Sequence, residues 1–326
     1  MMELWDIYDQ YRHKTDRLHE RGQEMKEGDY HLVVHVWIMN DKGEFLIQKR
    51  QPWKKGWANM WDSSAAGSAI VGDSSEQAAV REVKEELGID LNIADGERLF
   101  TVKFSCGFDD IWLVRQNVAI EDLHLQEEEV ADAKWASEAE IREMAEKGEF
   151  IPFNYFDLLF DSVNSNIVLK KASVEDAEEL LALQKEVFQP LYQKYNDHET
   201  SPATQTMERF LTRFERGEYF KIFFEGKMAG SVCVYEKSPG LMRLHIINIL
   251  DRFHNKGIAQ KVMVRLELMY PEADAWELAT IMSEERNCYL YEKMGYKQNG
   301  DLKIINDQMT LVGYRKETGL RKIEVI

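Results

Sequence analysis

The chain has 326 residues, enough for two domains of ordinary size, and 44% of them are hydrophobic. Its formal net charge of -17 argues against binding to nucleic acid or to an anionic membrane. The acidity either keeps the protein soluble or, in part, attracts a cationic amine. Cys106, Cys233 and Cys288 stand far apart, so neither a disulfide framework nor a zinc site is expected. We find neither an apolar stretch of the roughly 18 residues that a membrane helix needs nor a secretion signal, and we expect a cytoplasmic location.

The first half of the chain predicts a mixed α+β sandwich. Its strands are expected at residues 31–38, 44–50, 100–104 and 111–119, and its helices at residues 74–87 and 138–147. Ser74 or Ser75 can cap the first helix, and Gly88 ends it. The polar residues 161–166 predict a linker, which gives domains at residues 1–163 and 167–326.

The second half predicts an α/β domain in which helices wrap a mixed sheet. Strands are expected at residues 167–170, 220–224, 229–235, 243–250 and 276–279, with a closing strand pair near residues 301–316. Helices are expected at residues 175–187, 204–216, 257–269 and 286–294. The residues after Lys316 have no assigned element.

Three carboxylates share one face of the helix predicted at residues 74–87. Glu82, Glu85 and Glu86 are three and four positions apart and therefore project together. Like charges repel, and we see no basic partner placed among them, so a bound cation would stabilise the cluster. Mg²⁺ or Mn²⁺ prefers such oxygen ligands, and it polarises phosphoryl groups and activates water. A solvated glutamate-rich helix face is the alternative.

The spacing around these carboxylates resembles the Nudix box, which runs from a glycine through an Arg-Glu pair to a Glu-Glu pair. Every fixed position matches except Asp73, where glutamate is usual. The resemblance implies a Nudix α/β/α sandwich in which Arg81 orients the catalytic Glu82. It also implies a set of metal ligands: the carbonyl of Ala66 and the side chains of Glu82, Glu85 and Glu86. Glu128 or Glu129 is the candidate for a further ligand, and we choose Glu129, with an ordinary acidic loop as the alternative.

Residues 45–50 and 60–67 resemble the isopentenyl-diphosphate-isomerase-like branch of this fold. That isomerase needs a cysteine before the box glycine and a histidine after it, whereas this chain has Ala66 and Ser68, so we reject isomerase activity. Trp53, Trp57 and Trp61 stand at helical spacing and would either stack on a nucleobase or pack in a core or loop. The nearby basic residues either hold phosphates or line a surface hairpin: Lys49, Arg50, Lys54 and Lys55.

A strand that runs into a basic, glycine-containing turn and then into a helix forms the second motif, at residues 244–263. The N-terminus of a helix exposes unpaired N–H groups and so suits a pyrophosphate. Gly257 and Ala259 let phosphates approach the backbone, and Arg252 and Lys256 add positive charge.

Residues 254–259 resemble the acetyl-coenzyme-A loop of GNAT N-acetyltransferases, although His254 replaces the usual Gln or Arg. Residues 287–296 resemble the closing segment of the same family. The resemblance implies acetyl-CoA as cosubstrate and Tyr291 as the general acid that protonates the thiolate, with a core aromatic as the alternative role. It also implies the residues that bind acetyl-CoA: Ile249, Leu250, His254, Asn255, Lys256, Gly257, Ile258, Ala259 and Asn287. Ile249 and Leu250 would offer backbone groups to the pantetheine arm and the acetyl carbonyl.

We therefore expect a bifunctional enzyme that hydrolyses a nucleoside-diphosphate-linked or similar pyrophosphate substrate with Mg²⁺ and acetylates a small amine. The alternatives are that only one module is catalytic while the other binds a ligand or regulates, or that neither is catalytic. The general base of acetyl transfer stays open between His245, Glu199, Glu277 and a chain of waters. The sequence identifies neither substrate and does not indicate the oligomeric state.

Overall fold

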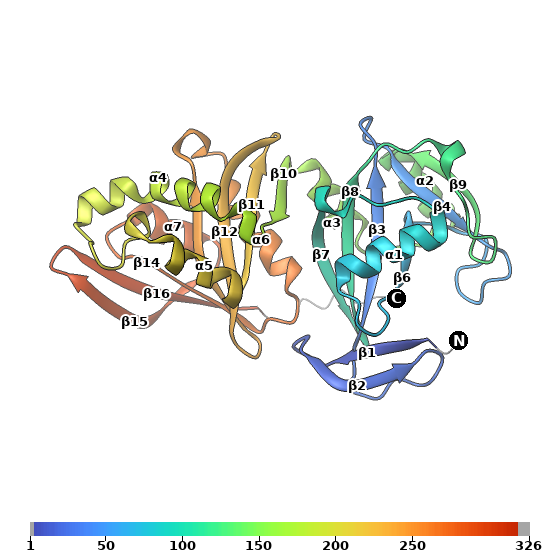
Figure 1. The fold of residues 1–326 in the computed structure, drawn as a ribbon, viewed down its shortest axis with the longest axis horizontal. Coiled ribbons are helices and arrows are strands. Elements are labelled where there is room, and N and C mark those ends of the chain that lie inside the picture. The colour runs from blue at the N-terminus through green and yellow to red at the C-terminus, as the bar shows by residue number, and fades with distance from the viewer. Residues whose placement is uncertain (1–2, 319–326) are drawn as a thin grey trace. The chain divides into compact units, whose positions relative to one another are not determined.

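The computed structural model describes residues 3–318, and the chain divides into two compact units between Asn164 and Ser165 (Figure 1). The predicted linker is wrong in detail, because most of residues 161–166 belong to helix α3 (Phe156–Asn164). That helix continues because Phe156, Leu159 and Phe160 are buried in the core of the first unit. The predicted second domain extends to residue 326, and residues 319–326 lie outside the described part of the chain.

The first unit is built on a sheet of seven strands whose central order is β5-β4-β3-β8-β7, with β6 pairing with β3 and β9 with β4. Strands β3 and β8 run parallel, whereas β7 and β8 are antiparallel. The strands are β3 (His31–Met39), β4 (Phe45–Arg50), β5 (Trp61–Asp62), β6 (Ala65–Ser68), β7 (Gly96–Phe104), β8 (Gly107–Arg115) and β9 (Val130–Ala136). The sequence analysis missed β5, β6 and β9, began β7 four residues late and placed the whole of β8 four residues too late along the chain.

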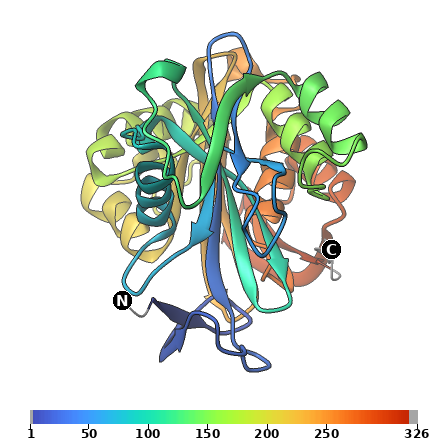
Figure 2. The ribbon, with the colours of Figure 1, turned by 90° about the vertical axis from the view of Figure 1, so that its right-hand side faces the viewer.

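Helices cover both faces of this sheet, as Figure 2 shows. Helix α1 (Ser75–Leu87) packs on one face through Ala78, Ala79 and Val83, and helices α2 (Glu138–Glu146) and α3 pack on the other. The Ser74 hydroxyl accepts a hydrogen bond from the Gln77 amide at 3.2 Å, and Gly88 caps the C-terminus of α1, as predicted. Burial of a larger aliphatic side chain such as Val83 stabilises this packing by about 1.5–3 kcal/mol, and burial of an alanine by less. Helix α1 is therefore held firmly against the sheet.

A hairpin of β1 (Leu4–Tyr8) and β2 (Lys14–Glu20) precedes the sheet, and no sequence pattern predicted it. Its turn carries Arg12, whose guanidinium donates to both carboxylate oxygens of Asp110 on β8, at 2.8 and 2.5 Å. Thr101 donates to the same carboxylate at 2.6 Å, and Arg98 lies 3.7 Å away. Asp110 is fully buried, and its pKa is well below the usual range because the two arginines outweigh the effect of burial. A charge-assisted network thus ties the hairpin to the sheet.

We predict that Asp110→Asn lowers the free energy of unfolding by about 3–5 kcal/mol, because it leaves two arginines without their buried partner. Urea denaturation at pH 7 would measure this. The difference should shrink as the pH falls below about 4, because the stability supplied by a carboxylate of lowered pKa is lost there. Asp90→Asn is the control, since the Asp90 side chain is 92% exposed. Equal loss in both variants would contradict the assignment.

The second unit contains a seven-stranded sheet of order β10-β11-β12-β13-β14-β16-β15. Its strands are β10 (Ile167–Lys171), β11 (Glu218–Phe224), β12 (Lys227–Ser238), β13 (Leu241–Ile249), β14 (Ala275–Ile281), β15 (Lys297–Asn306) and β16 (Met309–Glu317). Strands β13 and β14 are parallel and pair only from Leu241–Ala275 to Arg243–Glu277. Beyond that point β13 stays paired with β12 and β14 with β16, but they no longer pair with each other, so the sheet opens between them.

Four helices complete the second unit: α4 (Ala177–Tyr195), α5 (Met207–Arg216), α6 (Ile258–Met269) and α7 (Glu285–Lys293). Helix α4 runs well beyond the predicted end at residue 187 and contains Pro190. Leu180 of α4 and Phe210 of α5 pack with Tyr219 and Ile246 of the sheet, so both helices lie on the same face (Figure 1). In the described residues of both units, no helix is long and apolar enough to cross a membrane.

Candidate functional sites

The carboxylate of Glu82 on α1 lies against the backbone of Gly67 on β6. A Cβ atom at Gly67 would stand 2.2 Å from the Glu82 Cδ atom, which is far inside van der Waals contact. A side chain at position 67 would therefore displace the Glu82 carboxylate from the position it holds. Strand register places Gly67 opposite Val34 and Ala66 opposite His35, so pairing with the central strand β3 fixes the positions of both residues.

Arg81 joins the loop before α1 to the helix. Its guanidinium donates to Asp73 at 3.0 Å, to Glu82 at 2.8 Å, to Glu85 at 3.2 Å and to the carbonyl of Ser68 at 2.9 Å. The expectation that no basic residue partners the glutamates is wrong, because Arg81 adjoins Glu82 in sequence and lies one helical turn before Glu85. Asp73 reaches Arg81 although it is one methylene shorter than glutamate. The predicted positioning of Glu82 by Arg81 agrees with this geometry.

Glu86 lies deeper than the other two carboxylates. Gln48 on β4 donates to it at 2.7 Å, and the amide of Ala66 does so at 3.3 Å. Burial, and then the charge of Glu82, raises the pKa of Glu86 to about 8, and burial also raises the pKa of Glu82. The Gln48 Oε1 atom is buried and has no hydrogen-bond partner among residues 3–318. Gln48 was missed by the sequence analysis because it is 38 residues from Glu86.

The chemistry of these donors fits a hard divalent cation. The side chains are carboxylates, two of them partly desolvated, and a cation would offset the repulsion that raises the pKa of Glu86. Among the described residues, no three His, Cys, Asp or Glu side chains form a ready metal-binding group. Glu82 and Glu85 hydrogen-bond to Arg81 instead, and Glu129 forms an ion pair with Lys54. Glu129 therefore stays a prediction that requires Lys54 to move.

A buried polar cluster that the sequence analysis missed lies on the sheet beside Ala66. His35 on β3 is 3.3 Å from Asp109 and 2.7 Å from the hydroxyl of Tyr155. Burial raises the pKa of Asp109 to about 6, with His35 opposing it. The only signal in the sequence was a histidine between Val34 and Val36 in an apolar strand.

The predicted helical spacing of the tryptophans is not realised, because no helix forms between residues 51 and 61. Trp53 and Trp57 are exposed on that loop, and Trp53 donates to the carbonyl of Glu128 at 3.3 Å. Trp61 is half-buried on β5, and the amino groups of Lys49 and Lys134 lie over its ring. The two exposed rings remain candidates for stacking on a base.

The second predicted site surrounds the turn between β13 and α6. Asn255 and Gly257 have φ angles of 63° and 72°, and open space surrounds the position of a Cβ at Gly257. This left-handed conformation favours glycine and brings bare backbone to the start of α6, where Ile258 and Ala259 begin the helix beside Lys256. Such a turn suits a pyrophosphate, and the binding of one here stays a prediction.

His254 holds the turn together. Its Nε2 atom lies 2.9 Å from the carbonyl oxygen of Ile249, and its Nδ1 atom lies 3.2 Å from the guanidinium of Arg286 on α7. Leu250 stays a predicted contact of the cosubstrate, although both of its backbone groups already have partners. Its N–H donates to Ala229 at 2.9 Å and its carbonyl accepts from Phe253 at 2.8 Å. Strand alternation instead directs the N–H of Ile249 toward the opening between β13 and β14.

Tyr291 is the buried tyrosine of α7, with Tyr296 and Tyr314 beside its ring. Burial raises its pKa to about 12, so the phenol keeps its proton at neutral pH. Asn287, one turn earlier on α7, is half-buried. The roles of both residues stay predictions.

The three side chains proposed as general base lie in different environments. Glu277 forms ion pairs with Lys237 and Arg315, so it serves the packing of the sheet. Glu199 is exposed on the loop before α5. His245 lines a pocket between α5 and the sheet and is exposed to solvent there, and the surrounding protein together with neighbouring arginines lowers its pKa to about 4. A histidine with such a pKa is neutral but weakly basic.

Comparison with known proteins finds a match for each unit. The NUDIX domain model matches residues 29–158, and the acetyltransferase (GNAT) domain model matches residues 170–318. An uncharacterized Nudix hydrolase of Listeria monocytogenes is 46% identical over 167 residues, which are 51% of this chain and 99% of that protein. The chain belongs to the Nudix hydrolase family. Its second half is a GNAT acetyltransferase domain, so the chain is a two-module enzyme.

Two further relatives belong to one module each. An isopentenyl-diphosphate Delta-isomerase of Shigella flexneri is 29% identical over 118 residues, which cover 34% of this Nudix hydrolase and 64% of the isomerase. A GNAT-family acetyltransferase structure from Streptococcus pneumoniae is 18% identical, with a TM-score of 0.38, and covers 47% of this chain and 99% of that one. This Nudix hydrolase has Ala66 where isomerase chemistry would need a cysteine.

We predict that Gly67→Ala lowers kcat/KM for hydrolysis by about 100-fold, because the added methyl group displaces Glu82 by an ångström or more. Gly56→Ala is the matched control, since nothing lies within 4 Å of a Cβ there and the backbone φ is ordinary. Thermal unfolding would verify that both variants fold. Full hydrolytic activity of Gly67→Ala would show that the position of Glu82 does not matter.

Proposed function

We propose that the first unit hydrolyses a nucleoside-diphosphate-linked or similar pyrophosphate substrate with Mg²⁺ or Mn²⁺, and that the second transfers an acetyl group from acetyl-CoA to a small amine. The observation that carries the first half is the desolvated carboxylate group of α1, held over Gly67 by Arg81. The turn from His254 to Gly257 at the start of α6 supports the second.

In the hydrolase, Glu82, Glu85 and Glu86 would hold the cation together with the carbonyl of Ala66. The cation supplies charge neutralisation of the phosphoryl oxygens and activation of water. Arg81 keeps Glu82 in one orientation through a charge-assisted hydrogen bond of 2.8 Å. Gln48 fixes Glu86 from the sheet side. These contacts preorganise the carboxylates before substrate arrives, which reduces the reorganisation needed during the reaction.

In the acetyltransferase, the first turn of α6 binds the pyrophosphate of the cosubstrate, and the N–H of Ile249 faces the opening of the sheet where the acetyl carbonyl would lie. The amine nitrogen forms a bond to the acetyl carbon, and the bond from that carbon to sulfur breaks. Tyr291 donates its proton to the departing thiolate, and the amine releases a proton to water.

We predict that Glu86→Gln reduces hydrolysis at least 100-fold and leaves acetyl-CoA affinity unchanged. A screen of nucleotide diphosphate derivatives with Mg²⁺, with products identified by mass spectrometry, would supply the substrate for this assay. Without added metal the variant should be at least as stable as the natural chain, because a buried carboxylate repelled by Glu82 is gone. Glu143→Gln on α2 is the control. Undiminished hydrolysis in Glu86→Gln would sink the metal assignment.

We predict that Tyr291→Phe lowers kcat for acetyl transfer by a factor of about 100 or more, without weakening acetyl-CoA binding, because only the proton donor is lost. Thiol release would measure kcat, and calorimetry would measure binding. Tyr289→Phe changes a tyrosine of the same helix that is 67% exposed and should have no effect. Full activity of Tyr291→Phe would mean that water or another group protonates the thiolate.

A further inference from the structure

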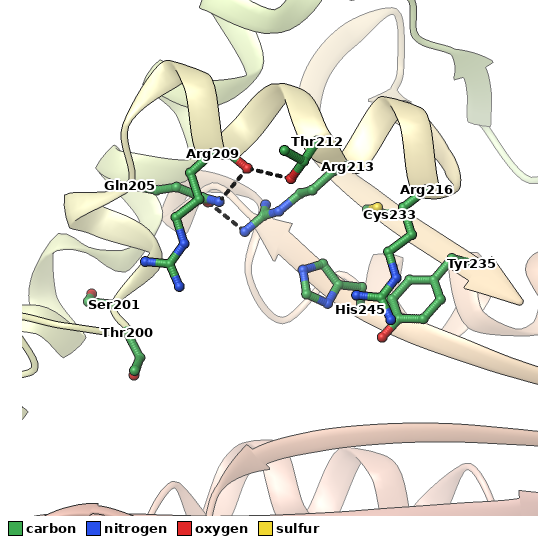
Figure 3. A pocket seen from close by; sticks show the side chains of 10 residues that line it. All are labelled: Thr200, Ser201, Gln205, Arg209, Thr212, Arg213, Arg216, Cys233, Tyr235 and His245. Carbon is green, nitrogen blue, oxygen red and sulfur yellow. Dashed lines mark hydrogen bonds between the residues drawn. The ribbon is translucent and has the colours of Figure 1, made fainter. Parts of the chain in front are cut away.

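A pocket of about 290 Å³ lies in the second unit between α5 and strands β12 and β13 (Figure 3). It is lined by Thr200, Ser201, Gln205, Arg209, Thr212, Arg213, Arg216, Cys233, Tyr235 and His245. Three of these residues are arginines and none is acidic, although the whole chain has 58 acidic against 41 basic residues. The lining of the pocket is thus positively charged, whereas the protein as a whole is negatively charged.

The three arginines come from one side of α5. Arg209 and Arg213 are four positions apart, and Arg216 follows three positions later, so their side chains share a helix face. Figure 3 shows the three guanidinium groups around the pocket, with Tyr235 and His245 on the strands below them. Three like charges on one face repel one another, which disfavours this arrangement unless something compensates it.

The partners of these guanidinium groups in the described structure are all uncharged. Arg213 donates to the side-chain oxygens of Gln184 and Gln205, the latter at 2.6 Å. Arg209 donates to the backbone carbonyl of Glu199 at 3.4 Å. Arg216 lies over the ring of Tyr235, 4.0 Å from its centre. No ion pair among the described residues neutralises them, so their charge is available to a ligand.

The position of the pocket relates it to the acetyl-transfer site. His245 follows Arg243, the last residue of β13 that pairs with β14, so it stands where the sheet begins to open. The register between β12 and β13 shifts at this point, from Cys233–Ile246 to Val234–Leu244, which leaves His245 without a strand partner. Such a bulge redirects a side chain, and that of His245 lines the pocket. The same strand ends at Ile249, beside the cosubstrate loop.

We propose that this pocket binds an anionic group, a carboxylate or a phosphate, of the amine that the second unit acetylates. The inference rests on the proposed acetyl transfer. Arg209 and Arg216 supply charge and N–H donors, and the hydroxyl of Ser201 supplies a further donor, whereas that of Thr200 donates to Asp197 at 2.7 Å. The same positive charge lowers the pKa of a nearby ammonium group, which favours the neutral amine that attacks the acetyl carbon. The acidity of the chain had suggested attraction of a simple cationic amine, which this pocket would repel.

The test uses matched amines with the full-length protein and acetyl-CoA. O-phosphoethanolamine is compared with ethanolamine, and glutamate and glycine are each compared with their amides, by thiol release and by calorimetry. We expect the member that carries the phosphate or carboxylate, in at least one pair, to have a KM or Kd at least tenfold lower than the partner without that group. The phosphate and carboxylate pairs show which anionic group is preferred. Equal affinity of both members in every pair would overturn the proposal.

Two variants test whether the preference for the anionic group arises from this pocket. In the double variant Arg209→Gln with Arg216→Gln, the ratio of the two KM or Kd values in each pair should approach one, and acetyl-CoA should still bind. Lys185→Gln removes a positive charge from the exposed face of α4 and should retain the preference. A preference that survives the double substitution would place the anion elsewhere and overturn the proposal. If the amines bind through the arginines but are not acetylated, the result would support the anion-binding pocket and contradict the proposed acetyl transfer to these amines.

Discussion

The geometry of the hydrolase unit depends on one guanidinium group. Arg81 contacts the carboxylates of Asp73, Glu82 and Glu85 and the carbonyl of Ser68, so one side chain connects β6, the following loop and α1. Without it, desolvated carboxylates would face one another with only Gln48 and a backbone amide to offset their repulsion. The absence of a side chain at Gly67 is the complementary requirement, because it lets Glu82 reach the strand. The guanidinium of Arg81 and the absence of a side chain at Gly67 together determine where the carboxylate of Glu82 lies.

The sequence was most informative where a site is local. The carboxylates of α1, its Ser74 cap and the turn ending at Gly257 each lie within one stretch of chain, and periodicity and spacing predict them directly. The α/β/α arrangement of the first unit and the mixed sheet of the second were also predicted correctly.

Contacts between distant residues were not predictable in this way. Arg12 and Asp110 are 98 residues apart, and Gln48 and Glu86 are 38 residues apart, so no periodicity links them. The helix predicted to end at residue 187 continues through Pro190 to Tyr195. The sequence analysis did not single out the arginines of α5, because only the fold places His245 and Tyr235 opposite them. Tertiary context, which a single sequence does not carry, decided each of these cases.

The arginine pocket also affects how an anionic acceptor reaches the enzyme. At long range such a molecule meets a protein of net charge -17, which repels it. At physiological ionic strength that repulsion fades over about 8 Å, whereas contacts inside a partly enclosed pocket are screened much less. Selection of the acceptor would therefore occur at short range, through its dissociation rate rather than its association rate. Adding salt would then assist the approach of the acceptor even as it weakens the final contacts.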